Sequence, residues 1–358
     1  MEKLNYRRTF FIGLAFLSIC AFWQMYDNVI PLILQNTFHL NETFTGAIMA
    51  ADNILAVFLL PFFGTLSDKA NTRLGKRTPF IIAGTGVAVL FLMLLPFADK
   101  NQNFIMFVAC LAVLLVAMGF YRSPAVALMP DLTPKPLRSK ANAVINLMGA
   151  VGGVYTLLLI RFLVKGGKRP DYTAVFAGVA FLMAAAVILL VLTVKEKKIA
   201  AEIEKEEIQE EELAGETIAE NTKELPKPVK KSLYMILLSI FFWFAAYNAV
   251  TTAFSRYAVK VWGLEGGGFA DCLMVATVAA ICSYIPIGII SEKFGRKKCI
   301  QGGLVLLLIS YLSAAFFPVY HPAINIGFVL IGIGWASISV NSLPMVVEIC
   351  SLGDVGKY

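Results

Sequence analysis

The sequence predicts an all-α polytopic membrane protein, and three observations support that fold class: its composition, its apolar runs and the placement of its basic residues. Of the 358 residues, 58% are hydrophobic and 15% are charged, and the mean hydropathy is +0.73. Soluble domains are about 45–50% apolar and about 25% charged. Apolar runs of about twenty residues recur along the chain, and each can cross a bilayer core of about 30 Å. These features exclude a soluble enzyme, a disulfide scaffold and a disordered chain.

Ten apolar segments are long enough to be membrane-spanning helices. They cover residues 9–35, 44–66, 79–98, 104–129, 140–164, 173–194, 233–258, 269–291, 299–318 and 323–350. The first follows Lys3, Arg7 and Arg8 and therefore looks superficially like a secretion signal. Its apolar part of about 26 residues lacks a small-x-small cleavage site, so we expect a retained helix.

Basic residues set the expected orientation. By our assignment, 23 Lys and Arg lie on the side of the N-terminus, five on the other side and three within spans. Because cytoplasmic loops carry the excess of Lys and Arg, we expect a multi-pass plasma-membrane protein with a cytoplasmic N-terminus. The net charge of +7 then reflects topology and predicts no nucleic-acid partner. One outer loop opposes the rule, because it contains Lys165, Lys168 and Arg169.

A charged segment at 195–232 separates two membrane halves. It holds 11 Glu and 8 Lys and few apolar residues, so apart from a solvated helix it cannot bury enough surface to fold alone. We therefore expect an N-terminal six-helix half at 1–194, a cytoplasmic linker at 195–232, and an incomplete C-terminal half of four helices at 233–358.

The two halves resemble each other at matching places. A Phe-Trp pair followed by Tyr occurs at 22–26 and again at 242–247, and a Gly-x-x-Ser-acid sequence followed by a basic turn occurs at 64–77 and 288–298. The offsets are similar, 221 residues for the two Tyr and 224 for the first Gly of each loop. Parallel six-helix repeats of this kind are typical of secondary transporters.

The repeat also predicts missing helices. The loop near Asp131 corresponds to the chain end near Glu348, so spans five and six have no counterpart in the second half. We therefore expect ten helices of a twelve-helix protein that lacks its last two. A natural ten-span protein is the alternative.

At these residues the sequence resembles the major facilitator superfamily, whose signature loop between spans two and three is similar to residues 64–77. More narrowly, it resembles the glycoside–cation symporters related to sucrose–proton transporters. Three stretches carry that resemblance: residues 67–81 (SDKANTRLGKRTPFI), Arg122 with residues 128–132 (LMPDL), and residues 138–143 (RSKANA). The resemblance implies the major facilitator fold and alternating access for a sugar or glycoside.

Three ionisable residues inside spans are candidates for proton coupling: Asp27, Asp52 and Arg122. Charged groups in a membrane core are costly and usually functional. Asp27 and Asp52 are expected at similar depths below the outer surface, where they could face one cavity and exchange a proton. The alternatives are that both acids serve helix packing and that Arg122 forms a permanent ion pair with Asp131.

Aromatic and amide side chains at matching places in both halves are candidates for sugar binding, because a sugar site needs ring faces and polar groups around a wet cavity. These candidates are Tyr26, Asn28, Asn53, Trp243, Tyr247, Asn248, Trp335 and Asn341. Packing against neighbouring helices is the alternative for each. Arg161 and Arg256 lie near span ends, where snorkelling of the side chain explains them.

The repeated loops between spans are candidates for a cytoplasmic gate, because their acids can contact basic groups and helix N-termini that must separate when the carrier opens inward. The residues are Gly64, Asp68, Arg73, Gly75, Lys76, Arg77, Asp131, Glu292, Arg296 and Glu348. The alternative is that these basic loops only set topology.

Together these features predict a secondary transporter that imports a sugar or glycoside with H⁺, Na⁺ being the other coupling ion considered. The sequence has no nucleotide-binding loop, its six cysteines show no CxxC spacing, and its two histidines, His39 and His321, are isolated in outer loops. We therefore expect no enzyme, no cofactor, no metal site and no obligatory protein partner. The alternatives are a carrier for another small solute, including an efflux carrier, and a non-transporting remnant.

Overall fold

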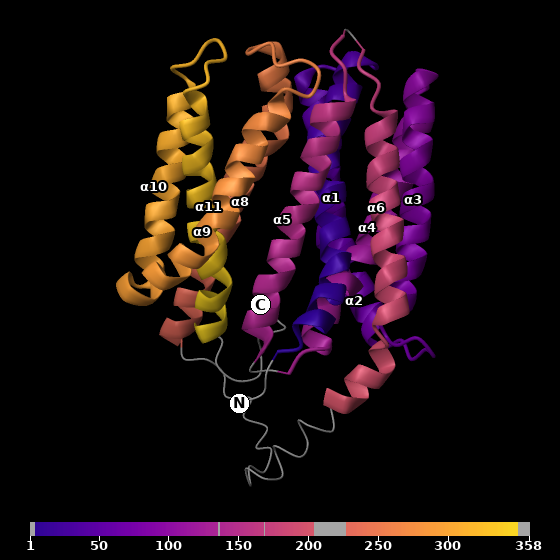
Figure 1. Ribbon diagram of the computed structural model, residues 1–358, viewed down its shortest axis with the longest axis vertical. Helices are drawn as coiled ribbons and strands as arrows, with labels where there is room; N and C mark the ends of the chain where they lie inside the picture. The colour runs from indigo at the N-terminus through magenta and orange to yellow at the C-terminus, as the bar shows by residue number, and fades with distance from the viewer. Residues whose placement is uncertain (1–3, 135–136, 168, 204–226, 350–358) are drawn as a thin grey trace. The chain divides into compact units, whose positions relative to one another are not determined.

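The computed structural model describes residues 4–134, 137–167, 169–203 and 227–349, which form long α-helices joined by short loops (Figure 1). By internal packing the chain divides into two compact units. The first comprises Met1–Gly215 with Glu265–Gly267, and the second comprises Glu216–Leu264 with Gly268–Tyr358.

The first unit is a bundle of six long helices that matches the first six predicted spans to within a few residues. The helices are α1 (Tyr6–Asn36), α2 (Glu42–Asp68), α3 (Thr78–Lys100), α4 (Phe104–Asp131), α5 (Arg138–Leu163) and α6 (Thr173–Thr193). Asparagine caps begin three of them, because the side chains of Asn5, Asn41 and Asn103 each accept a hydrogen bond from the backbone N–H three residues later.

Helix α1 is the centre of this bundle and packs against α5, α6 and α4. The approach to α5 is close: a Cβ added to Gly152 would lie 2.1 Å from the carbonyl oxygen of Leu17. The Tyr121 hydroxyl of α4 donates a hydrogen bond of 2.8 Å to the carbonyl of Ala15. These contacts bring the middle of α1 next to α4, where Arg122 follows Tyr121.

The second unit contains α8 (Lys227–Lys260), α9 (Phe269–Phe294), α10 (Arg296–Ala314) and α11 (Ile324–Ile349). Helix α11 packs against α9 and α10. Small residues allow this, because a Cβ added to Gly332 would lie 2.2 Å from the carbonyl oxygen of Ala276. Helix α8 has fewer neighbours: 6% of its apolar window is buried, compared with 67% in α1.

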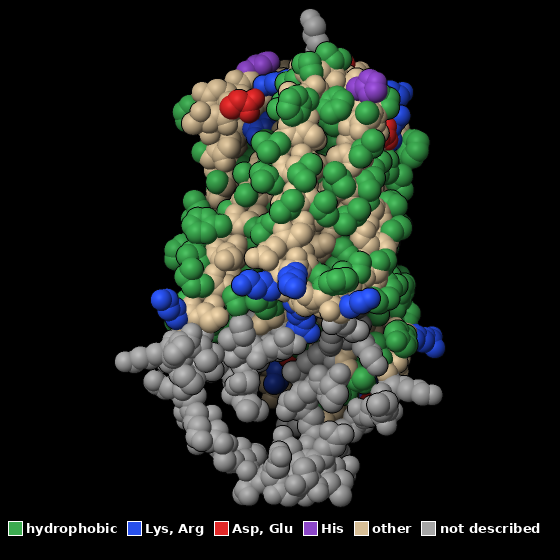
Figure 2. Space-filling view, turned by 90° about the vertical axis from the view of Figure 1, so that its left-hand side faces the viewer, with side chains coloured by type: hydrophobic (Ala, Val, Ile, Leu, Met, Phe, Trp, Pro, Cys, Tyr) green, Lys and Arg blue, Asp and Glu red, His purple; other side chains and the backbone are tan. Residues whose placement is uncertain are grey.

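Within the described ranges, nine helices are long and apolar enough to cross a membrane. Helix α10 is not among them. Its first turn holds Arg296, Lys297 and Lys298 and it ends at Ala314, which leaves an uncharged stretch of about 16 residues where a span needs about 20. The predicted span 299–318 is therefore helical only as far as residue 314. On the face shown in Figure 2, hydrophobic side chains cover the length of the helices, and Lys and Arg form a row near one end.

The predicted linker is helical at both of its described ends. Residues 196–203 form a short helix after α6, and the last residues of the predicted linker belong to the first turns of α8. Residues 204–226 lie outside the described part of the chain. The proposed domain boundaries at 194 and 233 stay predictions.

Candidate functional site

The three charged residues predicted for proton coupling lie on α1, α2 and α4 of the first unit. Asp27 is nine residues before the end of α1, and Asp52 is ten residues after the start of α2. At 1.5 Å per residue both are about 14–15 Å along their helices from the end of the bundle at which α1 ends. The side chains of Asp27, Asp52 and Arg122 are half-buried and interact electrostatically with one another. The structure therefore brings this predicted triad together.

Arg122 rests on an aromatic ring and not on a carboxylate. Its guanidinium carbon lies 5.6 Å from the centre of the Trp23 ring on α1. Within the described part of the chain it forms no hydrogen bond or ion pair, whereas Asp131 pairs with Arg77 at 2.8 Å. The alternative of a permanent Arg122–Asp131 pair is therefore wrong. The guanidinium interacts electrostatically with Asp27 and Asp52 and forms an ion pair with neither.

Two aromatic side chains lie in the same part of α1 as Asp27. Their polar atoms have no hydrogen-bond partner among the described residues. Tyr26 is fully buried, its ring centre lies 5.3 Å from that of Trp23, and it interacts electrostatically with both Asp27 and Asp52. The Tyr26 hydroxyl and the Trp23 indole N–H are buried and make no hydrogen bond to the residues that the structure describes. Buried polar atoms are normally satisfied, so these two donors are available to a bound solute or water.

The two predicted amides of this unit have different surroundings. The Asn53 side chain is exposed and donates a 2.8 Å hydrogen bond to Asp52, so it orients that carboxylate. Asn28 is buried and donates to the carbonyl of Gln24 in its own helix at 2.9 Å. Its side-chain oxygen has no partner in the described part of the chain.

The predicted binding residues of the second unit form an aromatic cluster. Trp243 and Tyr247 of α8 meet Trp335 of α11, with ring centres 5.5 Å apart for the two tryptophans and 4.2 Å apart for Tyr247 and Trp335. The Trp243 indole N–H is buried without a partner among the described residues. Asn248 and Asn341 instead donate 2.8 Å hydrogen bonds to carbonyls of their own helices.

The predicted gate residues of the first unit converge on Arg77, at the start of α3. Its guanidinium forms ion pairs with Asp68 and Asp131 and hydrogen bonds with Ser67 and the carbonyl of Gly64. Burial opposes the charged form, but the hydrogen bond and charge of Asp131 and the charge of Asp68 raise the pKa of Arg77 above its ordinary value. These residues are called the Arg77 network below.

Two other predicted gate residues of the first unit, Arg73 and Lys76, form no side-chain contact with Arg77 in the described part of the chain. The side chains of Arg73 and Lys76 are exposed. In the second unit, Arg296 begins α10, directly after Gly295. The side chains of Glu292 and Glu348 lie outside the described residues.

Sequence reasoning missed Glu196, which it placed in the linker. Its carboxylate accepts hydrogen bonds from the backbone N–H groups of Lys76 (2.7 Å), Arg77 (2.9 Å) and Thr78 (2.8 Å), and from the Thr78 hydroxyl (2.6 Å). One signal pointed to it: residues 75–79 (GKRTP) open α3 without an Asn, Asp or Ser to cap it. The acid that caps this helix start lies about 120 residues later in the chain, so no local pattern connects the two.

One residue of the basic loop that opposes the predicted orientation, Arg169, contacts an acid, and the acid Asp171 nearby pairs with a lysine at the end of α3. Lys100 forms an ion pair of 3.2 Å with Asp171, and Arg169 bonds to the carbonyl of Asp99 and lies 3.9 Å from its carboxylate. Hydrogen bonds from Thr173, followed by Lys100, lower the pKa of Asp171.

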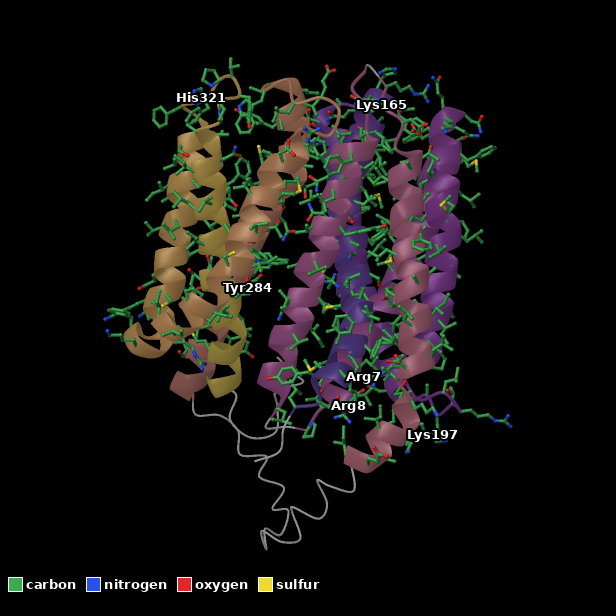
Figure 3. The ribbon with its side chains drawn as sticks, viewed as in Figure 1. Arg7, Arg8, Lys165, Lys197, Tyr284 and His321 are labelled. Atoms are coloured by element: carbon green, nitrogen blue, oxygen red, sulfur yellow. The ribbon has the colours of Figure 1, made fainter. Side chains whose placement is uncertain are left out.

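Figure 3 shows where the basic side chains of the first unit lie along the bundle. Arg7, Arg8 and Lys197 lie at one end and Lys165 lies at the other. Of the two arginines explained by snorkelling, Arg161 is exposed near the end of α5 and Arg256 is buried in the second unit.

Two curated membrane transporters are similar to this chain in sequence. Sucrose transport protein SUC3 of Arabidopsis thaliana is 24% identical over 151 residues, which are 37% of this chain and 25% of that protein. The probable nitrate transporter NarT of Staphylococcus epidermidis is 26% identical over 196 residues, which are 54% of this chain and 48% of that protein. The matches thus span about a quarter and about half of these curated relatives.

Solved structures share the fold across nearly the whole chain. The partially occluded inward-open form of the xylose transporter XylE from E. coli has a TM-score of 0.65 at 13% identity and covers 96% of this chain and 88% of its own. A POT family transporter in complex with a thioalcohol-conjugated peptide has a TM-score of 0.69 at 11% identity, with 98% and 86% covered. The sequence profile of the Major Facilitator Superfamily matches residues 12–358, so the chain belongs to that superfamily.

Proposed function

We propose that this chain is a plasma-membrane secondary transporter that imports a sugar or glycoside together with H⁺ by alternating access, with its N-terminus in the cytoplasm. The observation that carries the proposal is the meeting of Asp27, Asp52 and Arg122 in one half-buried site of the first unit. Ionisable groups inside membrane spans typically mark ion or substrate pathways.

The charges of this site suit the exchange of one proton. Arg122 cannot release its proton in a protein, so it supplies a fixed positive charge beside two carboxyl groups. One carboxylate balances that charge, and a second has no cation left to balance it. Because Arg122 is paired with neither acid, it can follow the ionised one when a proton binds or leaves. A solute that contacts the same groups would then couple its binding to protonation.

The polar and aromatic groups of both units favour an uncharged polyol. In the first unit, the Tyr26 hydroxyl and the Trp23 N–H have no hydrogen-bond partner among the described residues. In the second unit, Trp243, Tyr247 and Trp335 present clustered rings, which suit the C–H faces of a sugar. The likeness to a sucrose transport protein supports the same solute class.

We assign the Arg77 network to the cytoplasmic gate. Arg77 joins the end of α2 to the end of α4 through Asp68 and Asp131, so movement between these helix ends must break at least one ion pair. Contacts that exist in one state and not in another set the balance between states.

Solute-driven proton movement tests the coupling assignment. Weakly buffered cells that produce the protein receive sucrose, maltose, melibiose or an aryl glucoside, and external pH is recorded. We expect alkalinisation with at least one of these, unchanged when choline replaces Na⁺, and lost in Asp27→Asn. Asp171→Asn, which removes an exposed acid of an outer loop, is the matched control and should retain the signal. Normal proton uptake by correctly inserted Asp27→Asn would contradict the assignment.

A small anion is the second candidate solute, because Arg122 has no ion-pair partner among the described residues and one relative is a probable nitrate transporter. Nitrate added to the same cells separates the two proposals. Uptake of nitrate that depends on Arg122, with no response to any sugar or glycoside, would favour the anion.

A further inference from the structure

We propose that Glu196 is a positioning residue of the gate: its carboxylate fixes the backbone from which Arg77 reaches Asp68 and Asp131. The segment that follows α6 is then a working part of the gate and not a passive linker. This inference rests on the assignment of the Arg77 network to the gate.

The Glu196 carboxylate is fully engaged by the start of α3. It is 3% exposed, and both of its oxygens accept hydrogen bonds. One oxygen receives the N–H groups of Lys76 and Arg77, and the other receives the N–H and the hydroxyl of Thr78. Hydrogen bonds to a charged acceptor are stronger than neutral ones, and the positive end of the α3 dipole adds to them.

Helix α3 has no cap of its own. Its N-cap residue is Arg77, whose side chain makes no capping bond, and Pro79 stands in the first turn. Three other helices of the unit are capped by an asparagine adjacent in sequence. Glu196 therefore supplies from 118 to 120 residues away what these asparagines supply locally. A cap from a distant segment also makes the helix start depend on where that segment lies.

Gly75 provides the space for this carboxylate. Its φ of +122° is in the region that only glycine adopts readily, and a Cβ there would lie 2.3 Å from the Glu196 carboxyl carbon. Glycine at position 75 therefore allows both the backbone conformation of the loop and the position of the Glu196 carboxylate.

Arg77 is the point where the two sets of contacts meet. Glu196 holds its backbone N–H, while Asp68 and Asp131 hold its side chain. A displacement of residues 196–203 therefore moves the residue that joins α2 to α4. The same short helix offers a matched control: Glu202 is exposed and pairs with Lys198 at 3.8 Å.

Sidedness of cysteine labelling tests the proposal without any solute. Cys20 is half-buried on α1 and lies within electrostatic reach of Arg122. The other five cysteines are replaced by serine, and a membrane-impermeant maleimide is applied to full-length protein in vesicles from either side. In Glu196→Gln an NH₂ group replaces one acceptor oxygen. The gate side is the side of the membrane on which the Arg77 network lies. Because the loss of one hydrogen bond to Glu196 shifts the equilibrium between the open and the closed gate severalfold, labelling of Cys20 from that side should rise about threefold to tenfold.

The controls separate gating from general loosening. Glu202→Gln should label like the parent protein, and labelling of Glu196→Gln from the opposite side should not rise. Hydrogen exchange of the peptide that contains residues 76–78 should become faster in Glu196→Gln, which verifies that the cap is lost. Unchanged gate-side labelling, or an equal rise from both sides, would overturn the proposal. Because no proton or solute flux is measured, these results do not depend on the proposed transport.

A double variant tests the route through Arg77. If Glu196 acts by positioning Arg77, Glu196→Gln should add no further labelling to an Arg77→Gln protein. Additive increases would show that Glu196 acts independently of Arg77 and would overturn its role as a positioning residue.

Discussion

At the scale of single residues, the Trp23 ring is the support for the Arg122 guanidinium. A cation within about 6 Å of an aromatic centre gains about 0.5–2 kcal/mol, and the observed distance is 5.6 Å. We expect Trp23→Leu to release Arg122 toward the acids and to weaken solute-driven proton uptake. Trp23→Phe keeps a ring and should retain more of it. Initial rates of alkalinisation measure the difference, and equal losses in both variants would argue against the cation–π contact.

Arg77 is also a stabilising residue of the first unit. Its side chain is 7% exposed, whereas its partners Asp68 and Asp131 are 59% and 38% exposed and water can reach them. Arg77→Gln should therefore lower the free energy of unfolding by about 1.5–3 kcal/mol, the range for hydrogen bonds to charged groups. Thermal melting in detergent measures this. Arg73 is exposed, so Arg73→Gln should melt like the parent protein. An equal loss of stability in both variants would show that the change in net charge, and not the loss of the Arg77 contacts, causes the effect.

Single candidate residues could be predicted from the sequence where a charged residue lies in an apolar segment. Asp27, Asp52 and Arg122 were predictable because a charge in an apolar span requires a reason. Glu196 was not, because one acid among many in a charged segment carries no local signal. Its role depends on a fold that brings residue 196 to residue 77.

At the scale of helices, the α1–α5 contact depends on Gly152. A Cβ there would lie 2.1 Å from a backbone oxygen of α1, which cannot rotate away. Gly152→Ala should therefore cost about 1–3 kcal/mol of stability, as overpacked cores do. Gly86→Ala is the matched control, because nothing lies within 4 Å of its Cβ position in α3. It should be neutral or stabilise by up to about 1 kcal/mol. Melting temperatures of the two variants that moved in the same direction would contradict this.

Helix positions were predictable from the sequence because apolar length alone identifies a span. The predicted 104–129 and 173–194 differ from α4 and α6 by two residues or fewer at each end. The ninth segment, residues 299–318, was less well predicted. Its basic start was treated as a loop, but Arg296, Lys297 and Lys298 form the first turn of α10.

At the scale of the whole molecule, the orientation can be tested directly. In a protein without native cysteines, Lys197→Cys and Lys165→Cys place single thiols at opposite ends of the first unit, and both side chains are exposed. Because the end with Arg7, Arg8 and Lys197 is the more basic, impermeant maleimide added outside intact cells should label position 165 and not 197. Labelling of 197 alone would reverse the proposed topology.

The internal repeat was visible in sequence because it kept its glycines and aromatics. The Phe-Trp pairs at 22–23 and 242–243 lie on α1 and α8. Phe22 is fully buried, whereas Phe242 is 62% exposed. Helix α1 packs against α5 and α6, and the described helices of the second unit include no counterpart of these two, so the difference agrees with the predicted lack of counterparts to spans five and six.

The two repeated loops also place different constraints on sequence change. Gly75 and Gly295 both have positive φ, so each half needs glycine for its backbone. A side chain at Gly295 would meet nothing within 4 Å, whereas one at Gly75 would collide with Glu196. Position 295 is therefore constrained by its own backbone alone. Position 75 is bound to position 196 as well, so these two sites should change together or not at all as the sequence diverges.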